Sequence, residues 1–204
     1  MSKRTALEPF PNLVSMFLTR VAERGDKPFL WARSGSQWQS ISYAEAARQV
    51  AALAASLKRL GLKSGDRVAL VSENRPECLI ADLGIMAAGC VTVPTYTTNT
   101  QRDHQHILAN SGASAVIVSN QKLAKPLLPA VMYATDCQHV ISIDDIITGQ
   151  SADIAQFHGW ADLVKGGTDA DVDALRLAMA GVGRGDLACL IYTSGTGGAP
   201  RGVQ

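Results

Sequence analysis

The sequence lacks a strong charge of either sign. Its 19 lysines and arginines are matched by 18 aspartates and glutamates, which gives a formal net charge of +1. No cluster of basic residues occurs along the chain. Because proteins that hold the phosphate backbone of nucleic acids concentrate positive charge on one face, we expect no nucleic-acid partner.

Long hydrophobic runs are also missing. The longest apolar run, Leu83 to Val93, contains two glycines and ends at Pro94, whereas a membrane-spanning helix needs about 20 apolar residues. The charged start, Met1 to Arg4, is followed by Glu8 and Pro9 instead of the apolar core of a signal peptide. We therefore expect a soluble, cytoplasmic protein, and peripheral contact with a membrane remains compatible with the sequence.

Cysteine and histidine are scarce. The four cysteines are Cys78, Cys90, Cys137 and Cys189. Their wide spacing is typical of buried thiols in a reducing cytosol and indicates neither disulfides nor a metal site. His104 and His106 are two residues apart, so on a helix they point in different directions. No acidic or cysteine cluster completes a set of ligands, so we expect no metal there and both histidines exposed.

The composition is that of an ordinary globular protein, with 47% hydrophobic and 18% charged residues in a chain of 204. This is enough for one domain with a sizeable core. Helical periodicity predicts helices over residues 12–24, 42–60, 76–88, 100–108, 123–132, 154–165 and 169–180. Short apolar runs predict strands over residues 28–32, 38–41, 65–71, 89–93, 115–118, 139–143 and 187–192. After an initial hairpin, this alternation predicts a layered α/β fold with a mostly parallel sheet flanked by helices.

Polar groups follow several of the predicted strands, at the edge where open α/β sheets bind ligands. The loop Ser72 to Arg75 is one such group, although a satisfied turn is favoured there over a functional one. The hydroxyl-rich run Thr95 to Thr100 either binds a polar ligand or caps the helix that follows. The pair Asp144 and Asp145 indicates a helix cap more than a metal or ribose site.

The richest pattern lies at the end of the sequence, where Leu187 to Tyr192 is predicted to be a buried strand of the parallel sheet. The loop after it contains hydroxyls at Thr193, Ser194 and Thr196, glycines at Gly195, Gly197, Gly198 and Gly202, and one cation, Arg201. Glycines let backbone amides approach a ligand closely, while hydroxyls and arginine add donors. The loop therefore indicates a phosphate cradle. It is not a Walker loop, because no lysine followed by serine or threonine stands at the required spacing.

From Tyr192 to Gly202 the loop resembles the signature of the adenylate-forming enzymes, which include acyl-CoA synthetases, luciferases and the adenylation domains of peptide synthetases. Their pattern is Tyr-Thr-Ser-Gly-Ser/Thr-Thr-Gly-x-Pro-Lys-Gly. This chain departs from it at Gly197, where the family has threonine, and at Arg201, where it has lysine. Further segments are similar to the N-terminal part of long-chain fatty acyl-CoA synthetases: 65–70, 72–77, 86–94 and 96–100.

The resemblance implies a ligase that forms an acyl-adenylate and pyrophosphate from a long-chain fatty acid and ATP, after which the thiol of CoA displaces AMP. Mg²⁺ would bridge the phosphates and offset their charge. The residues implied to hold the β- and γ-phosphates are Thr193, Ser194, Gly195, Thr196, Gly197, Gly198 and Arg201. Relatives of the long-chain type form dimers, which implies a homodimer.

The resemblance assigns no catalytic residue to this chain, because the family's catalytic lysine belongs to a C-terminal domain. Residues 1–204 are therefore expected to be the incomplete N-terminal domain of an acyl-CoA synthetase, ending at the phosphate-binding loop and inactive alone. The alternative is a noncatalytic module, derived from this family, that binds a nucleotide or a partner protein through an unpaired sheet edge. Titration with ATP and pyrophosphate distinguishes the two in part.

Overall fold

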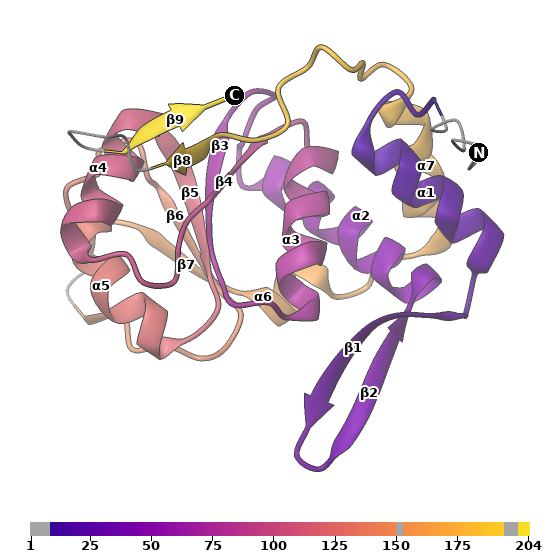
Figure 1. The fold of residues 1–204 in the computed structure, drawn as a ribbon, viewed down its shortest axis with the longest axis horizontal. Helices are drawn as coiled ribbons and strands as arrows, with labels where there is room; N and C mark the ends of the chain where they lie inside the picture. Colours follow the sequence, from indigo (N-terminus) through magenta and orange to yellow (C-terminus); the bar gives the residue numbers. More distant parts are fainter. Residues whose placement is uncertain (1–8, 150–152, 194–199) are drawn as a thin grey trace, which may run out of the picture.

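The computed structural model describes residues 9–149, 153–193 and 200–204, and a five-stranded sheet is its central element (Figure 1). Its strands are β3 (Arg67–Val71), β4 (Val91–Pro94), β5 (Ala113–Val118), β6 (His139–Ser142) and β7 (Gln156–Gly159). They lie in the order β4-β3-β5-β6-β7, and every neighbouring pair is parallel. The predicted α/β fold with a largely parallel sheet is confirmed.

Both faces of this sheet are covered by helices, which explains why the strands are continuous apolar runs. Along β3, Val68 and Leu70 face one hydrophobic cluster, whereas Ala69 and Val71 face another. The first cluster packs against α1 (Leu13–Arg24), α2 (Tyr43–Arg59), α3 (Pro76–Ala87) and α7 (Asp169–Met179). The second packs against α4 (Gln101–Ser111) and α5 (Gln121–Val131). The molecule is therefore layered, as Figure 1 shows.

The elements before the sheet form as the sequence predicts. Asn12 begins α1 by accepting a hydrogen bond from the Ser15 amide, and Ser42 begins α2 by accepting one from the Glu45 amide. Between them β1 (Pro28–Ser34) and β2 (Gln37–Ser42) form an antiparallel hairpin that projects from the rest of the molecule in Figure 1. Later in the chain, the helix predicted over residues 169–180 forms as α7, and Thr168 caps its N-terminus as predicted.

The predicted helix over residues 154–165 is wrong in its first half. Gln156–Gly159 is strand β7, which pairs with β6, and only Trp160–Val164 is helical, as α6. Pairing with a neighbouring strand decides the conformation of such a short segment, and its local pattern carries too little signal to reveal that pairing.

The predicted buried strand over residues 187–192 is also wrong in part. The segment meets the parallel sheet through one parallel bridge, between Cys189 and Thr92 of β4, in which the Thr92 amide donates to the Ala188 carbonyl at 3.0 Å and the Leu190 amide donates to the Thr92 carbonyl at 2.9 Å. Leu187 and Ile191 are exposed by 40% and 45%. The regular strand here is β8 (Ile191–Thr193), which pairs antiparallel with β9 (Arg201–Val203). Residues 188–190 therefore pair with the edge of the sheet over one bridge, and residues 191–193 pair with β9 instead.

The cysteines are free thiols, as expected, but they are not uniformly buried. Cys90 and Cys137 are buried, and burial raises the pKa of these thiols to about 11 and about 12. Cys78 and Cys189 are half-buried.

Among the helices of the described ranges, none is both long enough and apolar enough to cross a membrane.

Candidate functional site

The glycine-rich stretch connects the two strands of the β8–β9 hairpin. Thr193 and Arg201 are paired at the end of the hairpin where this connection begins and returns. Five residues of the predicted phosphate site lie outside the described residues: Ser194, Gly195, Thr196, Gly197 and Gly198. The two that the structure places, Thr193 and Arg201, are therefore neighbours across the hairpin.

The side chains of Thr193 and Arg201 are both exposed. Within the described ranges, no hydrogen bond or ion pair engages the guanidinium of Arg201. Arginine keeps its charge at any physiological pH and presents a planar fork of donors that suits phosphate oxygens. This end of the hairpin thus offers a cation and a hydroxyl to a ligand, as a phosphate-binding site requires.

Tyr192 anchors the first strand of the hairpin to the body of the protein. Its side chain is 4% exposed and packs in a small cluster with Val93 of β4 and Ile107 of α4. Its hydroxyl donates a hydrogen bond to Asn110 Oδ1 at 2.7 Å, and burial raises the pKa of the phenol. Across the hairpin, a Cβ atom on Gly202 would lie only 3.2 Å from Tyr192 Cζ, so a larger residue there would press on the ring.

His106 holds the beginning of the second strand. Its Nε2 atom lies 2.7 Å from the carbonyl oxygen of Pro200, the residue before β9. A carbonyl only accepts hydrogen bonds, so Nε2 carries the proton and donates it. The imidazole also meets the ring of Tyr192 edge-on, with 6.3 Å between centroids.

The expectation that both histidines are exposed is wrong. His104 is 2% exposed because it shares one face of α4 with Ile107 and Leu108, three and four residues further on, and burial lowers its pKa. His106 is half-buried against the hairpin. Sequence analysis gave no role to His106 or Asn110. The sequence contained one signal for a shared role: the two residues are four apart, which places both polar side chains on one face of a helix.

The carboxyl ends of β3 and β5 form the crevice where the strand order reverses, and this is where sheets of this topology bind ligands. The exposed residue Glu73 lies just after β3 at this end of the sheet. It accepts hydrogen bonds from the Ser119 hydroxyl and from Asn120 Nδ2, the latter at 2.7 Å. These bonds lower the pKa of Glu73 against the opposing effect of its burial.

The next residues of the same loop are also satisfied internally. Arg75 binds Glu77 through both Nε and Nη2, at 2.8 and 3.2 Å, and binds both carboxylate oxygens of Asp144 at 3.1 Å. The turn after β3 is therefore structural, as the sequence favoured. The prediction that Asp144 begins a helix is wrong, since no helix starts there and its carboxylate pairs with Arg75 instead.

The last residue of the hydroxyl-rich run after β4, Thr100, caps the N-terminus of α4. Thr100 and Asp103 form a reciprocal capping box that begins α4. Thr95 Oγ1 and Asn99 Nδ2 are buried and have no hydrogen-bond partner in the part of the chain that the structure describes. Binding of a polar ligand by this run stays a prediction.

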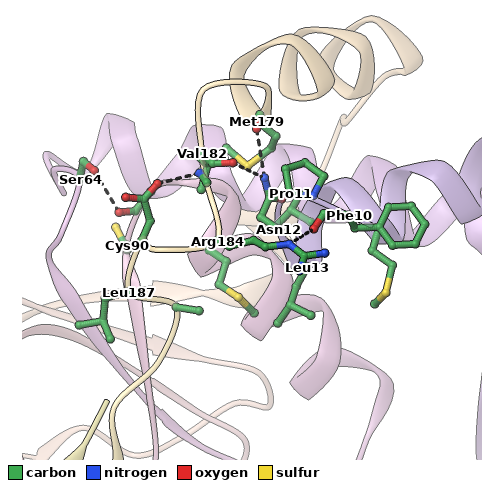
Figure 2. A pocket seen from close by; sticks show the side chains of 17 residues that line it. Phe10, Pro11, Asn12, Leu13, Ser64, Cys90, Met179, Val182, Arg184 and Leu187 are labelled. Carbon is green, nitrogen blue, oxygen red and sulfur yellow. Dashed lines mark hydrogen bonds between the residues drawn. The ribbon is translucent and has the colours of Figure 1, made fainter. Parts of the chain in front are cut away.

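A separate cavity of about 530 Å³ lies beside the amino end of β4 (Figure 2). Its walls come from the start of α1, the end of α7 and the segment that leads to β8. Asn12 Nδ2 bonds to the carbonyls of Met179 and Val182, and Arg184 Nε bonds to that of Phe10. Because these polar side chains are engaged by backbone groups of the same wall, we place the candidate functional site at the hairpin.

Comparison with known proteins points to one group of enzymes. A family model described as AMP-binding enzyme matches residues 17–204. The long-chain-fatty-acid–CoA ligase FadD15 of Mycobacterium tuberculosis is 33% identical over 174 residues, which cover 82% of this chain and 26% of that protein. The long-chain-fatty-acid–CoA ligase ACSBG2 of Xenopus laevis is 28% identical over 189 residues, covering 93% and 25%. The chain thus spans about a quarter of the length of these relatives.

Solved structures agree on the fold. The anthranilate CoA ligase AuaEII, in complex with anthranoyl-AMP, superposes with a TM-score of 0.77 at 21% identity, covering 96% of this chain and 35% of that one. The N-terminal subdomain of Klebsiella oxytoca NpsA, in complex with 3-hydroxybenzoyl-AMSN, gives a TM-score of 0.61 at 24% identity, covering 95% and 40%. At these identities the likeness supports the architecture alone.

Proposed function

This chain belongs to the family of AMP-binding enzymes, and from that premise we propose that it is the N-terminal part of an AMP-forming long-chain fatty acid–CoA ligase. The relatives that cover most of the chain carry that activity in their names, which supports the substrate class. In this proposal the substrates are ATP, a long-chain fatty acid and CoA.

The observation that carries the proposal is the guanidinium of Arg201, which no other described residue engages, beside Thr193 at the end of the hairpin next to the glycine-rich connection. In the proposed reaction a carboxylate attacks the α-phosphate of ATP and pyrophosphate leaves. Arg201 binds the β- and γ-phosphates and stabilises the charge that grows on the leaving pyrophosphate. The Thr193 hydroxyl adds a donor to the same phosphates and helps to orient them for in-line departure.

The described residues fit the phosphates better than they fit magnesium. Among them, no group of three or more histidine, cysteine, aspartate or glutamate side chains is placed to hold a metal ion. Mg²⁺ would offset phosphate charge in the complete enzyme, and the steps above do not depend on it. We include a cytoplasmic location, a homodimer and peripheral contact with a membrane in this proposal.

Titration of the chain with pyrophosphate and with ATP tests the proposal. Binding is the right measurement because the proposal places the catalytic lysine and the C-terminal domain beyond residue 204. We expect calorimetric binding of both ligands, weakened about tenfold or more in Arg201→Ala, because a charge-assisted hydrogen bond to phosphate is lost. Arg33→Ala, on the remote β1–β2 hairpin, is the matched control. Absence of binding to the unaltered chain would contradict the proposal.

A further inference from the structure

We propose that helix α4 positions the phosphate-binding hairpin, with His106 and Asn110 as the positioning residues. The inference rests on the proposed function, because it assigns a purpose to holding β8 and β9 in place. Neither side chain is proposed to touch the nucleotide. Each acts through a residue next to the glycine-rich connection.

The two positioning residues hold opposite strands of the hairpin. They are four residues apart on α4 and therefore lie on the same face of the helix. Asn110 accepts the hydrogen bond of the Tyr192 hydroxyl at 2.7 Å, just before the connection begins. His106 donates to the Pro200 carbonyl at 2.7 Å, just after the connection ends. Both ends of the connection are thereby fixed to one rigid element.

An apolar contact lies between these two hydrogen bonds. The Tyr192 ring packs against Val93 and Ile107, which are 0% and 2% exposed. The aromatic contact of His106 with Tyr192 joins this cluster to the polar contacts. A hairpin whose strands are three residues long is not stable by itself in water. It therefore depends for its position on neighbouring elements: β4, which is bridged to Cys189 just before β8, and α4, which alone contacts both ends of the glycine-rich connection among the described residues.

Helix α4 is itself fixed at both ends, which is what a positioning element requires. At its start, Thr100 and Asp103 exchange hydrogen bonds in the capping box. At its end, Arg67 of β3 donates to the carbonyls of Ser111 and Gly112, both at 2.7 Å. The hairpin is thus held in register with the parallel sheet, and less conformational entropy is lost when it binds phosphate.

Four variants and the unaltered chain test the inference, with pyrophosphate as the probe. His106→Leu and Asn110→Leu each remove one hydrogen bond, and the leucine side chain still fills space at the position. Asn110→Asp keeps an oxygen that accepts from Tyr192. Gln101→Ala, at an exposed position on the first turn of α4, is the control. Pyrophosphate affinity is measured by calorimetry, and amide hydrogen exchange is followed over β8 and β9.

We expect His106→Leu and Asn110→Leu to weaken pyrophosphate binding by about threefold to tenfold each, the size of one net hydrogen bond. Amide exchange in β8 and β9 should rise in both variants. Asn110→Asp should restore most of the affinity lost in Asn110→Leu, which a packing role alone would not do. Gln101→Ala should bind as the unaltered chain does.

The inference is overturned if both leucine variants bind pyrophosphate normally and exchange normally in the hairpin. It is equally overturned if amide exchange in the hairpin, without pyrophosphate, is as fast in Asn110→Asp as in Asn110→Leu, because the hydrogen bond is then not the cause. Should the unaltered chain fail to bind pyrophosphate, the proposed function fails on its own. Hydrogen exchange still decides the inference in that case, since faster exchange in the leucine variants supports positioning and unchanged exchange refutes it.

Discussion

At the scale of single residues, Gly202 shows that a glycine in a phosphate-loop motif can serve packing instead of ligand contact. It lies opposite Tyr192 in the hairpin, and the Tyr192 ring covers the place where a side chain would begin. A Cβ atom there would meet Tyr192 Cζ at 3.2 Å and Oη at 3.3 Å. The ring cannot move away freely, because its hydroxyl is bonded to Asn110 and its faces are buried.

Gly202→Ala should therefore shift the Tyr192 ring and weaken the contact of the hairpin with α4. We expect a loss of about 1–2 kcal/mol in the free energy of unfolding, the range for pressing extra volume against a packed side chain, here the buried Tyr192 ring, measured by urea denaturation. Gly185→Ala is the matched control, because a Cβ atom at that position has no neighbour within 4 Å. Equal stability of the two variants would show that the ring adapts without cost.

At the scale of elements, Arg67 joins the start of β3 to the end of α4. Its guanidinium donates to three carbonyl oxygens, those of Gly65, Ser111 and Gly112. Gly112 ends α4 in the left-handed conformation, with φ of 59°, and a Cβ atom there would lie 2.7 Å from Arg67 Nη2. The arginine and the glycine therefore form one joint, which satisfies the last carbonyls of the helix.

Arg67→Met keeps the apolar stem but removes all three hydrogen bonds of this joint. We expect the free energy of unfolding to fall by about 2–3 kcal/mol, because half-buried carbonyls lose charge-assisted partners. Arg67→Lys should retain only part of the stability that Arg67→Met loses, since an ammonium cannot reproduce the planar fork of donors. Arg102→Met, exposed on α4, should change stability by less than about 0.5 kcal/mol. A similar loss in both methionine variants would argue against the joint.

At the scale of the whole molecule, partly buried histidines make stability depend on pH. His139 of β6 and His158 of β7 face each other, with 3.2 Å between Nδ1 and Nε2. Burial lowers the pKa of both imidazoles, and the charge of a protonated His139 lowers the pKa of His158 further. Burial also lowers the pKa of His104.

Because these pKa values are lower in the folded chain than the ordinary 6.5, the unfolded chain binds protons more readily. Stability should therefore be greatest above about pH 6.5 and fall as the pH decreases below it. Urea midpoints between pH 7.5 and 5 measure this, and His158→Gln should make the decline shallower. Asp82 acts in the opposite sense, since burial raises its pKa. A midpoint that stays constant or rises towards pH 5 would refute the assignment.

The sequence by itself determined the fold class and indicated the candidate site. The signals for the fold class are local ones: apolar periodicity, helix caps such as Ser42 and Thr168, and glycine or proline at strand ends. Each can be recognised from the sequence alone. The glycine- and hydroxyl-rich motif marked the hairpin end where Thr193 and Arg201 now lie together. These features depend on neighbours in the sequence, which is why they were predictable.

Only the tertiary structure decided which segments pair and which polar groups are already engaged. Gln156–Gly159 became a strand because β6 offered an open edge, and the pairing of the last predicted strand with the sheet stops after one bridge because Ile191–Thr193 pairs with β9. The same holds for His106 and Asn110, whose partners are more than 80 residues away in sequence. Contacts over such separations depend on how helices and strands pack, and no local pattern encodes them.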